Sequence, residues 1–297
     1  MPDDPDPGSP RTRVTQHHPF NPPSATPNAS DDLRIAGDEP IRLIVADIDG
    51  CLSAGTGHPF DHDLLQTLAW ANRESRTNST VPAITLCTGR PQPYAECLLQ
   101  AIHGYHPALC ENGSVIFNPA NHDIFHHPDY GPEEAERLEE LHRRVATELC
   151  KSNVQPEPGK MTHITLIVQP PDTPAGLYPR ACEIAAEFGD TFQVELTSIC
   201  VHILFRHIHK GIGVQWLSHH TGIPLSQMAG IGDAAPDIAF LCLVGHAYAP
   251  ANAEPAVKEI CHSISPLCDA QAARHLLQQI IEHNKNYESE EASHLLP

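Results

Sequence analysis

The chain has 297 residues, of which 40% are hydrophobic and 19% are charged, enough for one large domain or two smaller ones. Its 37 Asp and Glu residues outnumber 18 Lys and Arg residues, giving a formal net charge of -19. That balance argues against nucleic acid as a partner, because no basic stripe is present that could neutralise phosphates. A small anionic substrate stays compatible, since a bound metal ion and a few local donors can reverse the field of a site.

Cysteine spacing and hydrophobicity narrow the class further. The 10 cysteines include no C-x-x-C pair, which argues against a zinc ribbon or a thioredoxin-like motif. No hydrophobic signal segment opens the chain, and no apolar run reaches the length of a membrane span. We therefore expect a cytoplasmic protein without a membrane partner.

The first 39 residues differ in composition from the rest. They are rich in Pro, Asp, Ser and Asn and show almost no apolar periodicity. Such a segment cannot bury enough apolar surface to offset the entropy of ordering it. Residues 1–39 are therefore predicted to be a disordered leader.

One stretch, 43–51 (LIVADIDGC), dominates the remaining sequence. Its apolar β-formers do not alternate with polar residues, which predicts a buried strand of a parallel sheet. The strand ends in Asp47 and Asp49, and Gly50 allows the backbone to turn so that both carboxylates face one site. A calcium loop is excluded, because Gly57 and His58 stand where further oxygen ligands are required.

A second strand near 81–87 ends in Thr88-Gly89-Arg90, and a helix with two prolines at its start follows. A third strand, near 106–110, is followed by Glu111-Asn112-Gly113, a hairpin signal. This alternation of strands and helices predicts an α/β fold with a Rossmann-like, doubly wound parallel sheet.

Between 118 and 205 the pattern changes to helices mixed with hairpin-like strands, which predicts an inserted α+β cap. The strand–helix alternation resumes at Lys210, and a strand over 228–231 leads to Asp233 and Asp237. The predicted organisation is a core over 40–117 and 206–284, the cap over 118–205, and a flexible tail over 285–297.

Four strand ends of this predicted sheet carry polar residues, and the carboxyl ends of parallel strands meet at one edge. Carboxylates of Asp47 and Asp233 suit Mg²⁺, and a carboxylate can attack phosphorus. Thr88, N–H groups after Gly89 and the Lys210 ammonium are suited to phosphate oxygens. Taken singly, each position also has an ordinary structural explanation, such as a helix cap, a surface lysine or a turn residue.

In this order, the four motifs resemble those of the haloacid dehalogenase superfamily of phosphohydrolases, over most of residues 41–277. The position of the insertion, together with Glu111-Asn112-Gly113 and residues 249–254 (APANAE), resembles the C2-capped Cof/sucrose-phosphatase-like (type IIB) branch.

The resemblance implies a role for each motif residue. Asp47 is the implied nucleophile and Asp49 the implied acid and base. Thr88, Gly89 and Lys210 are implied to bind phosphate. Mg²⁺ is implied to be held by Asp47, the backbone carbonyl of Asp49, and Asp233, with Asp237 in support. Arg90 and Asn112 are candidate substrate contacts, and Arg90 is equally compatible with a pairing to an acid.

Two positions depart from the family pattern. Cys51 stands where Thr is usual, which removes a hydroxyl from the loop. Pro236 stands where this branch usually has Asn, which puts one contact on the metal side in question. Neither departure removes the implied nucleophile, acid or lysine.

We therefore expect a Mg²⁺-dependent hydrolase of a small phosphorylated metabolite, such as a sugar phosphate or phosphoglycolate, working through an aspartyl-phosphate. A phosphomutase of the same fold and a catalytically silent binding protein are the alternatives. The sequence identifies neither the substrate, nor the cap residues that select it, nor the oligomeric state.

Overall fold

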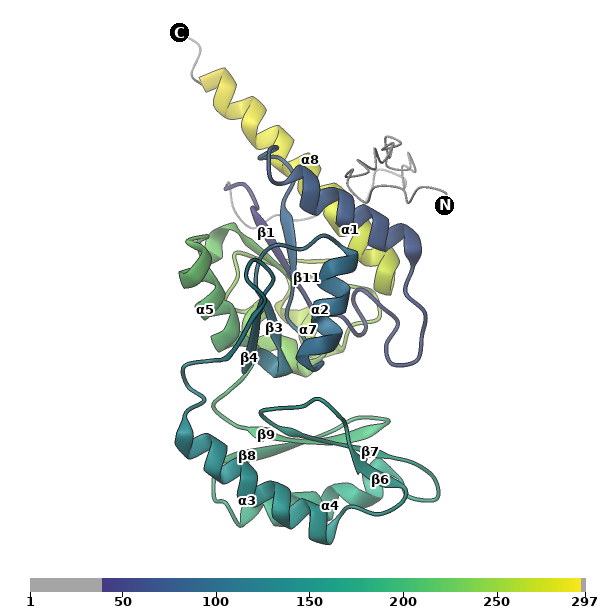
Figure 1. Cartoon of the computed structure of the whole chain (residues 1–297). Coiled ribbons are helices and arrows are strands. Elements are labelled where there is room, and N and C mark those ends of the chain that lie inside the picture. Colours follow the sequence, from purple (N-terminus) through teal and green to yellow (C-terminus); the bar gives the residue numbers. More distant parts are fainter. Residues whose placement is uncertain (1–38, 295–297) are drawn as a thin grey trace, which may run out of the picture.

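The computed structural model describes residues 39–294, so the predicted leader, apart from residue 39, lies outside the described residues. The larger unit is built on a five-stranded parallel sheet (Figure 1). Its order is β12-β11-β10-β1-β2, which puts β1 in direct contact with both β10 and β2. The strands are β1 (Leu43–Ala46), β2 (Ala83–Leu86), β10 (Met228–Ile231), β11 (His246–Ala249) and β12 (Ser263–Ile264).

Helices cover both faces of this sheet. Every residue of β1, β2, β10 and β11 is buried, because the strands project apolar side chains from both faces and both faces must be shielded from water. One apolar cluster packs α1 (His62–Glu74), α2 (Gln92–Ala101) and α8 (Asp269–His294) against one face. A second packs α5 (Lys210–Thr221), α6 (Ile238–Leu241) and α7 (Pro255–Ile260) against the other. The predicted doubly wound α/β fold is confirmed.

Beside β2 lies an antiparallel group of three strands, β3 (Ala108–Cys110), β4 (Val115–Asn118) and β5 (Asp123–His126). A bridge between Cys87 and Leu109 joins the group to the main sheet. The turn η1 (Glu111–Gly113) connects β3 to β4 and holds Asn112 at a left-handed φ of 59°. Because β5 pairs with β4, we propose that the inserted unit begins after His126 rather than at residue 118.

The inserted unit has a four-stranded antiparallel sheet in the order β6-β7-β9-β8, which confirms the predicted α+β cap. Its helices pack on one face through a separate apolar cluster that runs from Leu138 to Ile208. Figure 1 shows the opposite face of this sheet turned toward the larger unit. The elements are α3 (Pro132–Glu148), β6 (Val154–Pro156), β7 (Ile164–Val168), α4 (Pro174–Ala186), β8 (Phe192–Leu196) and β9 (Cys200–Phe205).

Two elements differ from the sequence prediction. The three-residue strand β6 is not predicted, because a short segment that ends in proline carries almost no periodicity. The predicted tail begins at residue 285, yet α8 continues to His294. Asn284 is buried, and its side chain accepts the N–H of Ile41 and donates to the carbonyls of Ile41 and Thr80. Those bonds tie the helix to the segments that lead into β1 and β2.

Within residues 39–294, no helix combines the length and the apolar character needed to cross a bilayer.

Candidate active site

Four side chains lie together at the carboxyl edge of the parallel sheet, and we call them the acid cluster: Asp47, Lys210, Asp233 and Asp237. Asp47 follows β1 and Asp233 follows β10, and these strands pair in register from Leu43 and Met228 onward. The N–H of Asp47 continues the ladder by donating to the carbonyl of Ile231 at 2.9 Å.

Lys210 is the cation of this cluster and is the first residue of α5. Its ammonium lies 2.6 Å from Asp237 Oδ1 and 3.0 Å from Asp47 Oδ1. The lysine and both carboxylates are buried. One carboxylate oxygen from each of Asp47, Asp233 and Asp237 lies within 4.8 Å of the other two. Asp47 and Asp237 therefore share a single buried lysine, and the half-buried Asp233 lies beside them.

The electrostatics reflect this excess of negative charge. Burial, reinforced by Asp237 and Asp233 and opposed by Lys210, raises the pKa of Asp47 to about 8. Burial and Asp237 raise the pKa of Asp233 to about 7. Burial alone would lower the pKa of Lys210, but its two carboxylate partners outweigh burial and hold the pKa above its usual range. The cluster accommodates a further positive charge more readily than a further negative one.

Gly50 and Cys51 explain how Asp233 approaches the loop after β1. Gly50 has a φ of +83°, and a Cβ at this position would lie 2.1 Å from Asp233 Oδ2. Only glycine fits both the conformation and the contact. The buried thiol of Cys51 lies 3.6 Å from Asp233 Oδ1 and donates to it, so the residue expected to be Thr still supplies a weak donor.

Pro236 occupies a short turn, η3 (Ala235–Asp237), where a residue without an N–H is tolerated. The buried Asp237 carboxylate accepts the N–H groups of Asp233 at 2.9 Å and Ala234 at 3.1 Å through Oδ2. Its Oδ1 holds Lys210. One oxygen of Asp237 thus fixes the backbone of the Asp233 loop, and the other binds Lys210.

Thr88 and Gly89 follow β2 at the same edge of the sheet. Thr88 is completely buried, and its hydroxyl accepts the N–H of Arg90 at 3.1 Å. A hydroxyl that accepts still has its own proton to donate. The amide group of Asn112 lies against Gly89, where an added Cβ would meet Asn112 Oδ1 at 3.3 Å.

Asp49 points to Arg90. The guanidinium donates to both carboxylate oxygens, from Nε to Oδ2 at 2.7 Å and from Nη2 to Oδ1 at 2.6 Å. The same Nη2 donates to Thr56 Oγ1 at 2.6 Å, and the guanidinium carbon lies 4.9 Å from the centre of the Tyr94 ring. The hydrogen bond to Asp49 raises the pKa of Arg90. Arg90 is therefore a partner of the predicted acid and base in this structure.

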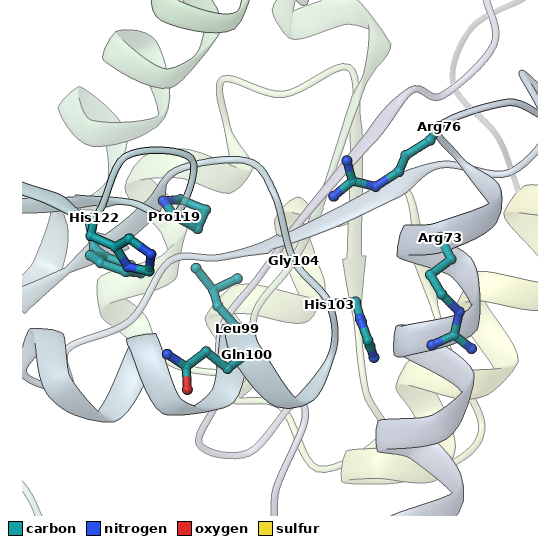
Figure 2. Close-up of a pocket in the computed structure, with 9 residues that line it drawn as sticks. Arg73, Arg76, Leu99, Gln100, His103, Gly104, Pro119 and His122 are labelled. Carbon is teal, nitrogen blue, oxygen red and sulfur yellow. The ribbon is translucent and has the colours of Figure 1, made fainter. Parts of the chain in front are cut away.

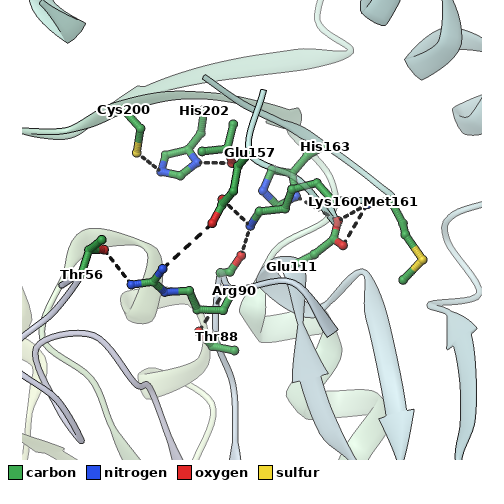
Figure 3. Close-up of polar contacts among 12 residues, drawn as sticks. Thr56, Thr88, Arg90, Glu111, Glu157, Lys160, Met161, His163, Cys200 and His202 are labelled. Carbon is green, nitrogen blue, oxygen red and sulfur yellow. Dashed lines mark hydrogen bonds and ion pairs between the residues drawn. The ribbon is translucent and has the colours of Figure 1, made fainter. Parts of the chain in front are cut away.

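Several residues at the site are absent from the sequence prediction. Lys160, from the loop between β6 and β7, donates to the carbonyl of Gly89 (Figure 3). Asn252 donates to the Gly50 carbonyl at 2.8 Å, and Glu254 accepts the N–H of Ala235 at 3.1 Å. The resemblance of residues 249–254 to the type IIB branch is the signal that could have found Asn252 and Glu254. Lys160 has no comparable signal.

A hollow of about 410 Å³ lies elsewhere, between α1, α2 and the β4–β5 turn (Figure 2). Arg73, Arg76, His103 and His122 line it together with apolar residues. None of the predicted site residues contributes to its wall. It is separate from the strand ends that carry the acid cluster.

A family model for haloacid dehalogenase-like hydrolases matches residues 174–276. Over these residues the chain is similar to this family. Among solved structures, the sucrose-phosphatase of Synechocystis, determined with sucrose and phosphate, aligns over 82% of this chain and 98% of its own. With 18% identity and a TM-score of 0.59, that likeness concerns the fold. The predicted resemblance to the Cof/sucrose-phosphatase-like branch of the haloacid dehalogenase-like hydrolases is confirmed.

Curated relatives named phosphoglycolate phosphatase match different shares of the chain. The protein from Halorubrum lacusprofundi is 25% identical over 67% of this chain and 86% of its own length. The protein from Methanothrix thermoacetophila is 40% identical, but the match spans only 21% of this chain and 28% of the relative.

Proposed function

We propose that this hydrolase is a Mg²⁺-dependent phosphatase that acts on the phosphomonoester of a small metabolite. The observation that carries the proposal is the contact of buried Asp47 with Lys210, beside Asp233, at the carboxyl edge of the sheet. The names of the two curated relatives support the same reaction class.

The acid cluster fits a divalent cation. Three carboxylates lie with one ammonium, and burial, reinforced by the neighbouring carboxylates, raises the pKa values of Asp47 and Asp233. Carboxylate and carbonyl oxygens are the ligands that Mg²⁺ prefers. Asp47, Asp233 and the backbone carbonyl of Asp49 would hold the ion. When bound, Mg²⁺ would offset the charge of the phosphate oxygens.

The chain's own residues supply the remaining chemistry. Asp47 uses a carboxylate oxygen to attack phosphorus, forming an aspartyl-phosphate as the bond to the leaving alkoxide breaks. Lys210, the Thr88 hydroxyl and N–H groups after Gly89 donate to the phosphate oxygens as negative charge develops. Lys210 needs no displacement to do so, because it already contacts Asp47.

Asp49 gives a proton to the leaving alcohol and later takes one from water. In the described conformation both of its oxygens are engaged by Arg90, so neither is positioned for this transfer. The mechanism therefore requires the Arg90–Asp49 pair to loosen when substrate enters. Catalytic hydrogen bonds often reach their working geometry only in the substrate complex.

A panel of phosphorylated metabolites and p-nitrophenyl phosphate, assayed for phosphate release with and without Mg²⁺, tests the proposal. Asp47→Asn should lower kcat by about 10⁴-fold or more, as expected for loss of a nucleophile. Asp63→Asn, a change to an exposed acid in α1, is the control. A wild-type protein inactive on the whole panel, or an Asp47→Asn variant as active as wild type, would rule the proposal out.

A phosphomutase would carry the same aspartyl-phosphate and pass the phosphoryl group to a second hydroxyl. Product analysis with one sugar phosphate separates the two reactions, because the phosphatase releases inorganic phosphate and the mutase yields an isomer.

A further inference from the structure

Two cations and one carboxylate meet where the cap touches the larger unit, and we call Arg90, Glu157 and Lys160 the cap contact (Figure 3). The Lys160 ammonium lies 3.5 Å from Glu157 Oε2, and Arg90 Nη1 lies 4.0 Å from Glu157 Oε1. The lysine side chain is only 4% exposed. Glu157 therefore lies between a buried ammonium and a guanidinium.

Glu157 is held loosely compared with the other ion pairs of the site. Arg90 contacts Asp49 at 2.6 Å, and Lys210 contacts Asp237 at the same distance. At 3.5–4.0 Å the contacts of Glu157 are longer than these charge-assisted hydrogen bonds, so each pair is weaker than the two shorter ones. Lys160 keeps another partner if Glu157 leaves, because it also donates to the Gly89 carbonyl.

The position of Lys160 is fixed by a residue of the larger unit. Glu111 is 1% exposed, and its carboxylate accepts the N–H groups of Met161 at 2.9 Å and Thr162 at 2.9 Å. It also accepts the Thr162 hydroxyl at 2.7 Å. These bonds hold the cap segment against η1, directly beside the Thr88-Gly89 loop. Glu111 is thus a positioning residue for Lys160.

Burial lowers the pKa of Lys160, since desolvation disfavours the ammonium and the nearby carboxylates only partly oppose it. A closer anion would stabilise the charged lysine. The same anion could reach Arg90 Nη1, which is the nitrogen that faces Glu157 rather than Asp49.

We propose that Arg90 and Lys160 form a subsite for a carboxylate of the substrate, and that Glu157 occupies this subsite when no substrate is bound. This inference rests on the proposed phosphatase function and narrows its substrate class to phosphorylated carboxylic acids. Glu157 indicates the ligand chemistry, because a carboxylate already lies between the two cations. Arg90 links this subsite to the reaction through its bond to Asp49.

The test compares 2-phosphoglycolate with ethyl phosphate, which differ only in that a methyl group replaces the carboxylate. We expect Lys160→Met to lower kcat/KM for 2-phosphoglycolate by about 10–100-fold, as for loss of one charge-assisted contact, and to affect ethyl phosphate far less. Glu157→Gln removes the competing carboxylate, so KM for 2-phosphoglycolate should fall. Lys151→Met, at an exposed cap lysine, is the matched control.

Isothermal titration of the Asp47→Asn protein with each of the two ligands, in the presence of Mg²⁺, measures the affinity of the subsite without turnover. In that background, we expect Lys160→Met to weaken the binding of 2-phosphoglycolate by a factor at least tenfold larger than its effect on the binding of ethyl phosphate. Equal losses for both ligands, or no preference of the parent protein for 2-phosphoglycolate, would overturn the subsite. If the binding preference is present while no phosphomonoester is hydrolysed by wild type, the subsite stands and the phosphatase function fails.

Discussion

The acid cluster and the cap contact both bring charged side chains together, but they are held in different ways. In the acid cluster, Lys210 lies 2.6 Å and 3.0 Å from its carboxylates, and each group follows a strand or begins a helix. In the cap contact, the ion pairs of Glu157 span 3.5–4.0 Å and come from loops. The first arrangement suits groups that must stay fixed during the reaction. The second suits groups whose contacts with one another are replaced by contacts with a ligand.

Removing the cation of the acid cluster should have the largest effect. Lys210→Met leaves Asp47 and Asp237 buried without their partner, which should cost about 3–5 kcal/mol of stability. We also expect kcat to fall by about 10³-fold, because a donor to the developing charge is lost. Denaturant unfolding and steady-state assays measure the two effects.

Lys285→Met, at an exposed position of α8, is the control for this change. If Lys210→Met kept wild-type stability and kcat, the acid cluster would not depend on its lysine as described.

Substitution of two glycines distinguishes the effect of backbone strain from the effect of a contact with Asp233. Gly50 and Gly57 share a φ of +83°, but only Gly50 would bring a Cβ against Asp233. Each change to Ala should cost about 1–2 kcal/mol of stability from the left-handed conformation. Gly50→Ala alone should displace Asp233 and raise the Mg²⁺ concentration needed for half-maximal activity at least tenfold. Equal Mg²⁺ requirements in both variants would contradict the geometry at Gly50.

A smaller effect should appear in the pH dependence of thermal stability. The pKa of Asp47 rises from its ordinary 3.8 to about 8 on folding. Between these values the folded chain keeps a proton that the unfolded chain has lost, so stability falls as pH increases. Mg²⁺ should replace this proton. Its addition should therefore raise Tm by several degrees at pH 8 and by less at pH 5.

Scanning calorimetry of the metal-free and Mg²⁺-loaded protein at both pH values measures this difference, with Asp233→Asn as the variant in which it should shrink. A Mg²⁺ effect that is larger at pH 5 would contradict the assignment of the cation to the acid cluster.

The acid cluster could be predicted from sequence because rigid strands deliver its residues to one edge. An apolar run without alternation is enough to predict β1, and parallel pairing then brings Asp47 and Asp233 together despite their distance in the chain. The cap contact could not be predicted. Lys160 belongs to a loop without periodicity, and its position depends on the bonds that Glu111 makes across the two units.

The bidentate bond between Asp49 and Arg90 also could not be predicted from the sequence. From the sequence alone, Arg90 was compatible both with a substrate contact and with a pairing to an acid. Side-chain pairing between two loops depends on their exact conformation, which hydrophobic patterns do not encode. The same holds for Cys51, whose thiol contacts Asp233 in a way that no spacing rule predicts.

Asp47 is the proposed nucleophile. Rapid acid quenching during turnover of a substrate found with the metabolite panel, followed by borohydride reduction and peptide mass mapping, tests it directly, because reduction converts an aspartyl-phosphate to homoserine. We expect homoserine at position 47 and an unchanged residue at position 49. Reduction at another carboxylate, or no reduced residue under conditions in which phosphate is released in a burst, would contradict the claim.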